Sequence, residues 1–394
     1  MLMKCKNCLG SNMDRGKRHV KAANYNAKIY MELKDIIRES ALPFLPAKSL
    51  FKCTSVCRDW KLQISTPFFA HNQSYSFRGF SGLFCQTLDG PPTFIPLDDK
   101  AHGVPDPTLS FLPVPIVVRC SSNGLVCCQD STGAYYICNP VTKHWKKLPR
   151  PNGDHGAEPA IVLIFEPSLL SFEAEYKLVC AFKSSDFDGL EFEIFSSTKG
   201  SWRISGEIIF GNRRLIPGSG IYTDGVVYWM TDAFSIFGFD LAKERSITIP
   251  GRNTLGVMNG KLCSFKFGSR DLTIEVLSNV HTNTMAMNSR ESGWKKIRHI
   301  EFDASILSGQ TTAGDSATGD KASAIHFQMS GRGRYGARSE SVLFANHEMV
   351  VFQTEKRVIA LDLKTSSSSV LTTAENAFGT DTRFVSYVNS LINL

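Results

Sequence analysis

The sequence has no long hydrophobic run and none of the residue strings that mark the commoner catalytic sites. Its longest clear apolar run is Ala160–Phe165, far short of the roughly 18 residues that a membrane-spanning helix needs. The nine histidines are scattered, and the His-Glu-x-x-His, Gly-x-Ser-x-Gly and Walker patterns are missing. These absences argue against a helical membrane protein and against the commoner hydrolases and nucleotide-binding enzymes.

The sequence also lacks the even, paired cysteines of an exported protein. It has 11 cysteines and no apolar leader near its N-terminus, so we expect reduced thiols in the cytosol or the nucleus. Cys5 and Cys8 form half of a zinc-binding pattern, but no second close pair follows, and we expect neither a metal nor a cofactor. Six cysteines with apolar neighbours are expected to be buried core residues: Cys53, Cys57, Cys120, Cys138, Cys180 and Cys263.

Positive charge is scarce outside one end of the chain. Residues 1–30 carry seven lysines and arginines against Asp14 alone, so they hold six of the seven net positive charges. The near neutrality of the remainder argues against a nucleic-acid-binding or membrane-binding domain. We expect residues 1–30 to be a basic, disordered arm. A nuclear address, contact with an acidic partner and nucleic-acid association through this arm are the alternatives.

Helical periodicity is confined to residues 31–76, which we call the helical module. Apolar residues recur at helical spacing in two runs: Leu33, Ile36, Ile37, Ala41, Leu42 and Leu45, then Leu50, Cys53, Val56, Cys57 and Trp60. Pro46 can open the second helix, and Thr66 followed by Pro67 is typical of the start of a third. Three short helices are too small to bury a self-sufficient core, so the module predicts a partner.

The order of these residues resembles the F-box, in the form in which a Leu-Pro pair opens the main helix and Val-Cys-Arg-x-Trp closes it. Here the pair is Leu45-Pro46 and the string is Val56–Trp60, within a resemblance that covers roughly residues 32–74. The resemblance implies docking on a Skp-type adaptor and, through it, on a cullin–RING ubiquitin ligase. The adaptor-binding residues that it implies are Leu33, Ile36, Leu45, Pro46, Leu50, Val56, Cys57 and Trp60.

Two positions depart from the F-box pattern. Leu33-Lys34 stands where the family usually has a first Leu-Pro pair, and Pro43 lies near the end of the first predicted helix. A proline inside a helix removes a hydrogen bond and clashes with the preceding turn, so we expect the first helix to kink or end there. These departures concern the detailed geometry of docking.

From about residue 77 the pattern changes to short alternating runs separated by tight turns. Five units of a turn followed by a strand begin at these residues: Asn123, Asp188, Asp224, Asn259 and Asn346. A second recurring element, strand, polar turn and strand, carries Trp145, Trp202 and Trp294 in matching places. Such repeats favour a β-propeller of about six blades over a β-sandwich or barrel, which would show similar turns.

The same repeats resemble the F-box-associated, kelch-like propeller. Ser122–Cys127, Cys138–Thr142, Gly225–Trp229 and Tyr387–Leu391 follow the order of that family, and we expect these motifs to hold blades together without binding a ligand. The predicted chain is thus a small all-α module followed by a large all-β domain. Its predicted segments are residues 1–30 (arm), 31–76 (F-box), 77–117 (linker and first propeller strands) and 118–392 (propeller).

Gly331–Gly336 matches the Gly-x-Gly-x-x-Gly string of dinucleotide-binding proteins. That fingerprint needs a strand before it and a helix after it, whereas strand-like residues follow here and a Gly/Ser/Thr-rich stretch precedes it. We therefore expect a mobile loop at about residues 307–340 rather than a cofactor site. Three arginines in and beside this string are expected to be solvated, with contact to an acidic partner as the alternative: Arg332, Arg334 and Arg338.

Three hypotheses of function remain, one of which is the nucleic-acid association through residues 1–30 named above. In the first, the F-box docks on the adaptor and the propeller binds a target protein for ubiquitination, so that the chain works by proximity and supplies no catalytic group. In the second, the propeller is a small-ligand binder or an enzyme and the module only localises it. The sequence does not identify the target or the loops that bind it, because loops vary freely on a fixed scaffold.

Overall fold

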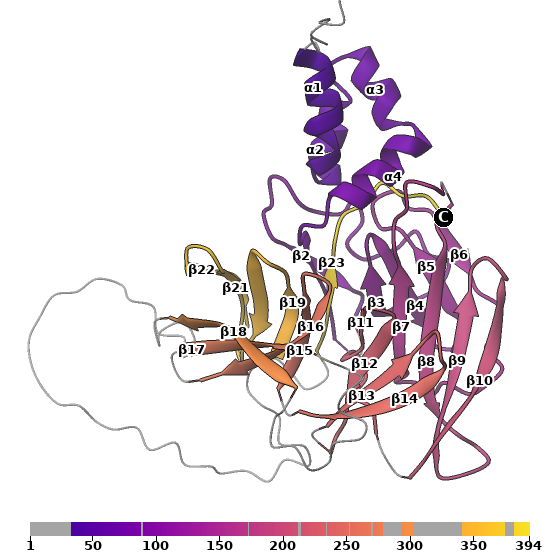
Figure 1. Ribbon diagram of the computed structural model, residues 1–394. Helices are drawn as coiled ribbons and strands as arrows, with labels where there is room; N and C mark the ends of the chain where they lie inside the picture. Colours follow the sequence, from indigo (N-terminus) through magenta and orange to yellow (C-terminus); the bar gives the residue numbers. More distant parts are fainter. Residues whose placement is uncertain are drawn as a thin grey trace, which may run out of the picture.

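The computed structural model describes residues 33–87, 90–171, 173–211, 214–233, 235–251, 253–268, 271–278, 293–302, 341–374 and 382–394. It shows four short helices at one end of an all-β domain (Figure 1). Three features considered above lie outside the described residues: the arm at 1–30 with Cys5 and Cys8, the predicted loop at about 307–340, and the Gly331–Gly336 string within it.

The helical module contains four α-helices and one 3-10 turn among its described residues. They are α1 (Leu33–Ser40), η1 (Leu42–Phe44), α2 (Ala47–Cys53), α3 (Arg58–Ile64) and α4 (Pro67–Ser76). The start predicted for the last helix is confirmed, since Thr66 Oγ1 accepts a hydrogen bond from Phe69 N (3.1 Å) and Pro67 lies in the first turn. As expected from Pro43, α1 ends before that residue.

The single helix predicted from Pro46 to Trp60 is wrong. The backbone of Cys57 is extended, with φ of −156°, and its Sγ accepts a hydrogen bond from Trp60 N (3.5 Å), so Cys57 caps α3 instead of continuing α2. Cys57 is also exposed, contrary to its predicted burial. The apolar spacing continued through the break because Cys53 and Trp60, on different helices, both pack against one core.

The β domain consists of six antiparallel sheets, which confirms the predicted six-bladed propeller. Blade 1 is β3 (Ile116–Ser122), β4 (Leu125–Asp130), β5 (Tyr135–Cys138) and β6 (Trp145–Lys147). Blade 2 is β7 (Ala160–Phe165), β8 (Tyr176–Lys183), β9 (Gly189–Ser196) and β10 (Ser201–Phe210). Blade 3 is β11 (Ile221–Thr223), β12 (Val226–Met230), β13 (Ser235–Asp240) and β14 (Arg245–Pro250).

The remaining blades close the ring. Blade 4 is β15 (Thr254–Met258), β16 (Lys261–Phe267), β17 (Asp271–Leu277) and β18 (Trp294–Glu301). Blade 5 is β19 (Ser341–Ala345), β20 (Met349–Gln353), β21 (Arg357–Asp362) and β22 (Ser368–Thr373). Blade 6 joins the two ends of the domain, with β23 (Arg383–Tyr387) paired to β1 (Gly82–Gln86) and β1 paired to β2 (Thr93–Pro96). Because β23 contacts both β3 and β19, the C-terminal strand completes the circle.

Tight turns join the strands at the propeller face nearest the helices. Asn123, Asp224 and Asn259 adopt left-handed φ values of 44°, 51° and 52°, and each is followed by a glycine with positive φ. Two successive positive φ values make the mirror-image turns that match the twist of a hairpin, so three of the five predicted tight turns are confirmed, at Asn123, Asp224 and Asn259. We call this end of the blades the module-side face and the opposite end, with the turn at residues 131–134, the far face.

The helical module and the propeller share one hydrophobic core. Leu42, Leu50 and Phe69 belong to the same buried cluster as Phe84 and Tyr387 of blade 6. Blades 2 and 3 pack through a second cluster, in which the Phe192 and Phe239 rings stack with centroids 4.4 Å apart. The partner that the small module needs to complete its core is therefore supplied, on one side, by its own propeller.

Candidate functional site

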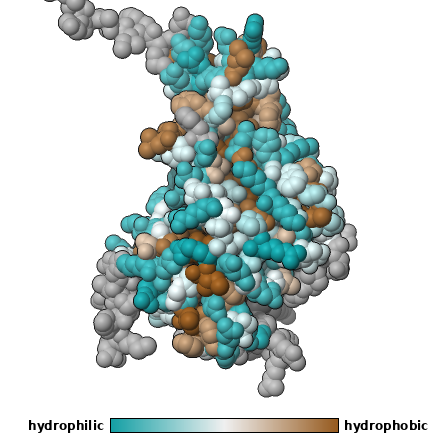
Figure 2. Space-filling view, turned by 90° about the vertical axis from the view of Figure 1, so that its right-hand side faces the viewer, coloured by the Kyte–Doolittle hydropathy of each residue, from teal (hydrophilic) through white to brown (hydrophobic). Residues whose placement is uncertain are grey.

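The helical module exposes an unusual amount of apolar surface. Figure 2 shows hydrophobic residues reaching this surface at the helical end, at the top of the view. Large apolar side chains on the module are exposed at eight positions: Leu33, Ile36, Phe44, Phe51, Val56, Leu62, Phe68 and Tyr75. Exposed apolar residues that gather on one part of a protein indicate an interaction surface, whereas isolated ones need no explanation.

The eight predicted adaptor-binding residues differ in burial. Four are exposed: Leu33, Ile36, Val56 and Cys57. Two are half-buried against the shared core: Leu45 and Trp60. Two are buried: Pro46 and Leu50. Only the first two groups can touch a partner in this arrangement. Leu50 instead belongs to the core that the module shares with the propeller, and Pro46 is buried at the start of α2.

Gln73 ties the module to the C-terminal segment of the chain. Its side chain is 0% exposed, and its Nε2 donates hydrogen bonds to the carbonyl oxygens of Leu45 (3.2 Å) and Asn389 (3.4 Å). Its Oε1 accepts a hydrogen bond from Leu391 N (3.1 Å). A buried amide with both ends satisfied fixes the position of its neighbours. Gln73 thus fixes α4 against residues that follow the last propeller strand.

Three of the recurring sequence motifs meet at this junction. Tyr387 Oη lies 3.3 Å from both Gly124 O and Asn139 Oδ1, while Asn139 Nδ2 donates hydrogen bonds to the carbonyl oxygens of Ser390 (2.9 Å) and Ile392 (2.7 Å). Burial raises the pKa of the Tyr387 hydroxyl well above its usual range, so the hydroxyl keeps its proton. These contacts agree with the structural role expected for the motifs.

Two of the three blade tryptophans, Trp202 and Trp294, bridge neighbouring blades, whereas Trp145 is exposed. Trp202 of β10 donates a hydrogen bond from Nε1 to Pro149 O (2.9 Å), which follows the last strand of blade 1. Trp294 of β18 makes the equivalent bond to Pro250 O (3.3 Å), at the end of blade 3. Their matching places in the sequence therefore reflect one repeated contact between an outer strand and the preceding blade.

One buried chain of polar side chains has the residue types of an acid–base site. His155 lies 3.0 Å from Tyr135 Oη through Nδ1 and 2.9 Å from Glu193 Oε2 through Nε2. Burial raises the pKa of Tyr135, and the side chains of all three residues are almost completely enclosed. A reactant could not approach these atoms, so the chain of bonds serves to join blades 1 and 2.

The far face carries a wide cleft of about 1180 Å³ between blades 6 and 1. Prolines line its rim, and Arg119 lies at its wall. The Arg119 guanidinium is already engaged, since it donates to Gln129 Oε1 (2.9 Å) and pairs with Glu158 Oε1 (3.1 Å). Burial alone would raise the pKa of Glu158, but Arg383 and Arg119 outweigh burial and lower it. The Arg119 charge at the wall of the cleft is thus already paired with a carboxylate.

The described residues show little sign of other kinds of site. Within them, no group of three or more His, Cys, Asp or Glu side chains is placed to hold a metal ion. The nine cysteines that the structure describes are all free thiols. None of the helices in the described ranges is long and apolar enough to cross a membrane.

Sequence reasoning missed part of the exposed apolar surface. Phe44, Phe51, Leu62 and Phe68 project into solvent but were not among the predicted adaptor-binding residues. A signal was present, because Phe51 and Leu62 interrupt the otherwise polar faces of α2 and α3. Gln73 was also missed, since a single glutamine in a short helix gives no indication of burial.

Comparison with known proteins agrees with this architecture. Residues 110–283 match the family described as the F-box associated beta propeller domain. F-box protein At5g49610 of Arabidopsis thaliana is 34% identical over 108 residues, covering 27% of this chain and 30% of the relative. F-box protein At5g07610 of the same plant is 28% identical over 214 residues, covering 48% of this chain and 49% of the relative.

A third relative, putative F-box protein At4g09190 of Arabidopsis thaliana, is 26% identical over 215 residues and covers 51% of this chain and 54% of its own length. The chain thus spans about half the length, or less, of these curated relatives. The family match lies in blades 1 to 4, and the six sheets supply the complete propeller. The chain thus combines short N-terminal helices with a six-bladed propeller that matches the F-box associated beta propeller domain over residues 110–283, and it is similar to F-box proteins of Arabidopsis thaliana.

Proposed function

We propose that this chain is a substrate-recognition subunit of a cullin–RING ubiquitin ligase. Its helical module docks on a Skp-type adaptor, and its propeller binds the target protein that receives ubiquitin. The observation that carries the proposal is the exposed apolar surface of the module, formed by residues such as Leu33 and Val56, which are 72% and 63% exposed. Burying this surface against a partner would remove it from water, which is the main driving force of association.

The way the module is attached supports the same function. Gln73, the shared core and hydrogen bonds from Lys48 and Lys52 to the carbonyl oxygens of Asp99 and Lys100 fix the helices to blade 6. A rigid connection holds whatever the propeller binds at a set distance from whatever the module binds. The ligase would then act through effective concentration, in the cytosol or the nucleus, with the chemistry performed by the other subunits.

A co-purification experiment tests adaptor docking. The full chain and a Skp-type adaptor are produced together, and adaptor recovery is compared with that of the variant Leu33→Asp/Val56→Asp. Two buried charges at the interface should reduce recovery by at least about tenfold. The matched control is Ile208→Asp/Phe210→Asp, which places the same charges on exposed apolar positions of β10 and should leave recovery unchanged.

Two outcomes would contradict adaptor docking. One is full adaptor recovery with the Leu33→Asp/Val56→Asp variant, and the other is an equal loss with the control on β10. A thermal unfolding curve for each variant shows that the propeller remains folded. Point substitutions are preferable to deletion of residues 31–76, because deletion would also expose the propeller part of the shared core.

The far-face cleft supports a second candidate function, the binding of a small molecule. Its volume of about 1180 Å³ would hold a metabolite-sized ligand. A thermal-shift screen of metabolites, sugars and nucleotides tests this function, because a ligand that binds only the folded state raises the melting temperature. Val114→Trp, at the cleft, should abolish a true shift, whereas Val370→Trp, on exposed β22, should not. An unchanged melting temperature across the screen would remove this candidate.

A further inference from the structure

A small pocket on the module-side face lies between blades 2 and 3. Its volume is about 260 Å³. Lys177 of β8, Ser196 of β9 and Ser201 and Arg203 of β10 line it from blade 2, and Leu241, after β13, lines it from blade 3. Lys177, Ser196 and Ser201 are register partners across three adjacent strands, so their side chains lie side by side.

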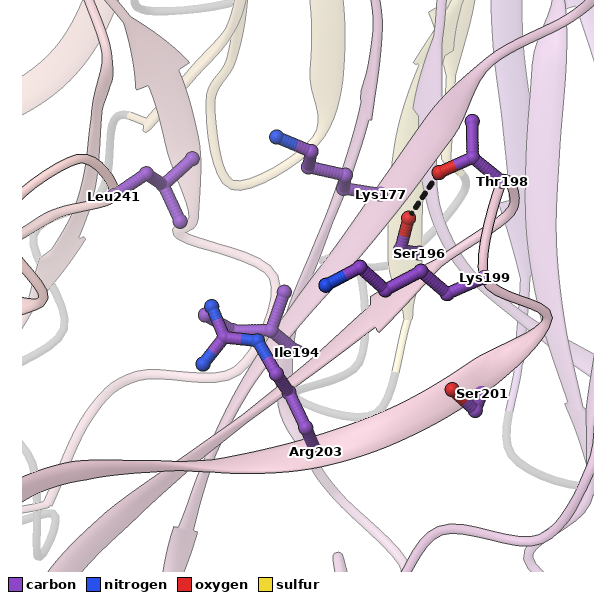
Figure 3. A pocket seen from close by; sticks show the side chains of 8 residues that line it. All are labelled: Lys177, Ile194, Ser196, Thr198, Lys199, Ser201, Arg203 and Leu241. Atoms are coloured by element: carbon purple, nitrogen blue, oxygen red, sulfur yellow. Dashed lines mark hydrogen bonds between the residues drawn. The ribbon is translucent and has the colours of Figure 1, made fainter.

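Three cationic side chains reach into this pocket. Figure 3 shows the ends of Lys177, Lys199 and Arg203 extending toward the same space, opposite Leu241. Arg203 is neutralised by a two-pronged ion pair with Glu244, in which Nη1 lies 2.9 Å from Oε2. By contrast, no carboxylate among the described residues lies within 4.0 Å of the ammonium group of Lys177 or Lys199. The pocket therefore holds two uncompensated positive charges.

Hydroxyl groups complete the lining. Ser196 Oγ and Thr198 Oγ1 are 2.8 Å apart, so one of the two hydroxyls donates to the other and the second keeps a free hydrogen. Ser201 Oγ has no hydrogen-bond partner in the part of the chain that the structure describes. Two ammonium groups and two available hydroxyl donors match a phosphate group, which carries close to two negative charges near neutral pH and three strong acceptor oxygens.

We propose that this pocket binds a phosphorylated serine or threonine side chain of the target protein. The inference deepens the function proposed above and rests on it, since it concerns what the propeller recognises. The pocket volume is below the range of about 300–1000 Å³ that is usual for small-molecule sites. A pocket of this size at the seam of two blades suits the end of one side chain, while the rest of the peptide lies across the turns at residues 197–200 and 241–244.

Peptide libraries test the proposal without knowledge of the target. The full chain, bound to its adaptor, is passed over beads that carry random peptides with a central phosphoserine and over matched beads with serine. Phosphoserine beads should retain at least about ten times more protein than serine beads. Retention should fall about tenfold or more in Lys177→Ala/Lys199→Ala, because both charge-assisted contacts are lost. The control Lys183→Ala/Lys261→Ala removes two exposed lysines elsewhere on the propeller and should not change retention.

Each result decides the proposal. Equal retention on phosphoserine and serine beads, or unchanged retention of the Lys177→Ala/Lys199→Ala variant, would overturn it. Titration with inorganic phosphate and with glucose 6-phosphate forms the second arm, and micromolar binding of either would reassign the pocket to a free phosphate compound. Adaptor recovery is measured in the same samples. If the wild-type chain recovers the adaptor normally but shows no preference for phosphoserine beads, only this inference is refuted, whereas phosphoserine binding without adaptor recovery refutes only adaptor docking.

Discussion

The helical module and the propeller differ in how much of their apolar side chains they expose to solvent. Of the 18 large apolar side chains that are exposed among the described residues, eight lie in the module, which makes up less than a sixth of those residues. Most of the described aromatic residues of the propeller are buried, many of them between blades, where facing sheets cover each other. A closed ring leaves few apolar residues uncovered, whereas the module is covered on one side only. The buried apolar residues of the propeller thus stabilise the fold, whereas the exposed ones of the module are available to a partner.

The largest expected effect comes from placing a charge on the covered side of the module. Leu50 is 0% exposed within the core that the module shares with the propeller. Leu50→Asp should therefore lower the free energy of unfolding of the full chain by about 4 kcal/mol or more, because the carboxylate has no partner there. Val56→Asp, on the open side, should change it by less than about 0.5 kcal/mol. Urea unfolding of both variants measures the difference.

The comparison between Leu50→Asp and Val56→Asp also has a clear failing outcome. If the two variants unfold at the same urea concentration, the module does not depend on the propeller for its core. Adaptor recovery adds a second measurement, because Val56→Asp should lose the adaptor while remaining fully stable. Leu50→Asp should lose both stability and the adaptor.

A second prediction concerns the buried carboxylate of the propeller. Glu193 is 0% exposed and accepts hydrogen bonds from Asn152 N (2.9 Å), Asn152 Nδ2 (2.7 Å) and Gly153 N (3.1 Å), in addition to its contact with His155. Glu193→Gln places an amide NH₂ against these donors and should cost about 3 kcal/mol of unfolding free energy. Glu191→Gln, on the same strand, is the control and should cost less than about 1 kcal/mol.

The Glu193 prediction includes a dependence on pH. Burial alone would raise the pKa of Glu193, but the hydrogen bonds from His155, Asn152 and Gly153 outweigh burial and lower it from the usual value of 4.5. A carboxyl whose pKa is lower in the folded state contributes stability above the unfolded pKa and loses it as the pH falls through the folded pKa. The difference between wild type and Glu193→Gln should thus be constant near neutral pH and shrink below about pH 4.5. A difference that grows in acid would contradict this account.

A third prediction uses two glycines in equivalent turns. Gly124 and Gly225 both follow a residue with positive φ and have positive φ themselves, 96° and 78°. A Cβ at Gly124 would lie 2.1 Å from Ser390 Cβ, whereas one at Gly225 would meet nothing within 4 Å. Both alanine variants lose about 1 kcal/mol to backbone strain, and Gly124→Ala should lose about 2 kcal/mol more because it displaces the C-terminal segment. Equal melting temperatures would show that this segment moves aside freely.

Much of the fold could be predicted from local sequence. Asn-Gly and Asp-Gly pairs mark the tight turns at residues 123, 224 and 259, since few other residues accept two positive φ values. The Thr66-Pro67 pair marked the start of α4 in the same way. The break at Cys57 could not be predicted, because helices on either side turn their apolar residues to one core, so the spacing looks continuous.

The candidate sites were less accessible to sequence reasoning. Pro46 and Leu50 were predicted to bind the adaptor together with Leu33 and Val56. The sequence does not show whether an apolar residue is covered by its own chain or by a partner, and the structure buries only the first two. The two lysines of the proposed phosphate-binding pocket, Lys177 and Lys199, come from different elements, β8 and the turn before β10. Nothing in the sequence distinguishes them from the other exposed lysines of the chain. Strand register alone brings them together, and register depends on the whole sheet.

The smallest expected effect on stability comes from the ion pair between Arg203 and Glu244, beside the proposed phosphate-binding pocket. Arg203 and Glu244 join blades 2 and 3, but the arginine side chain is 47% exposed. Water and salt screen such a pair, so a double-mutant cycle with Arg203→Ala and Glu244→Ala should give a coupling below about 1 kcal/mol, and less in high salt. A coupling above about 2 kcal/mol would mean that surface charge holds these blades together. The stacked rings of Phe192 and Phe239 already cover the apolar seam beneath the pair. Because that seam is closed without it, the ion pair contributes little to holding the two blades together.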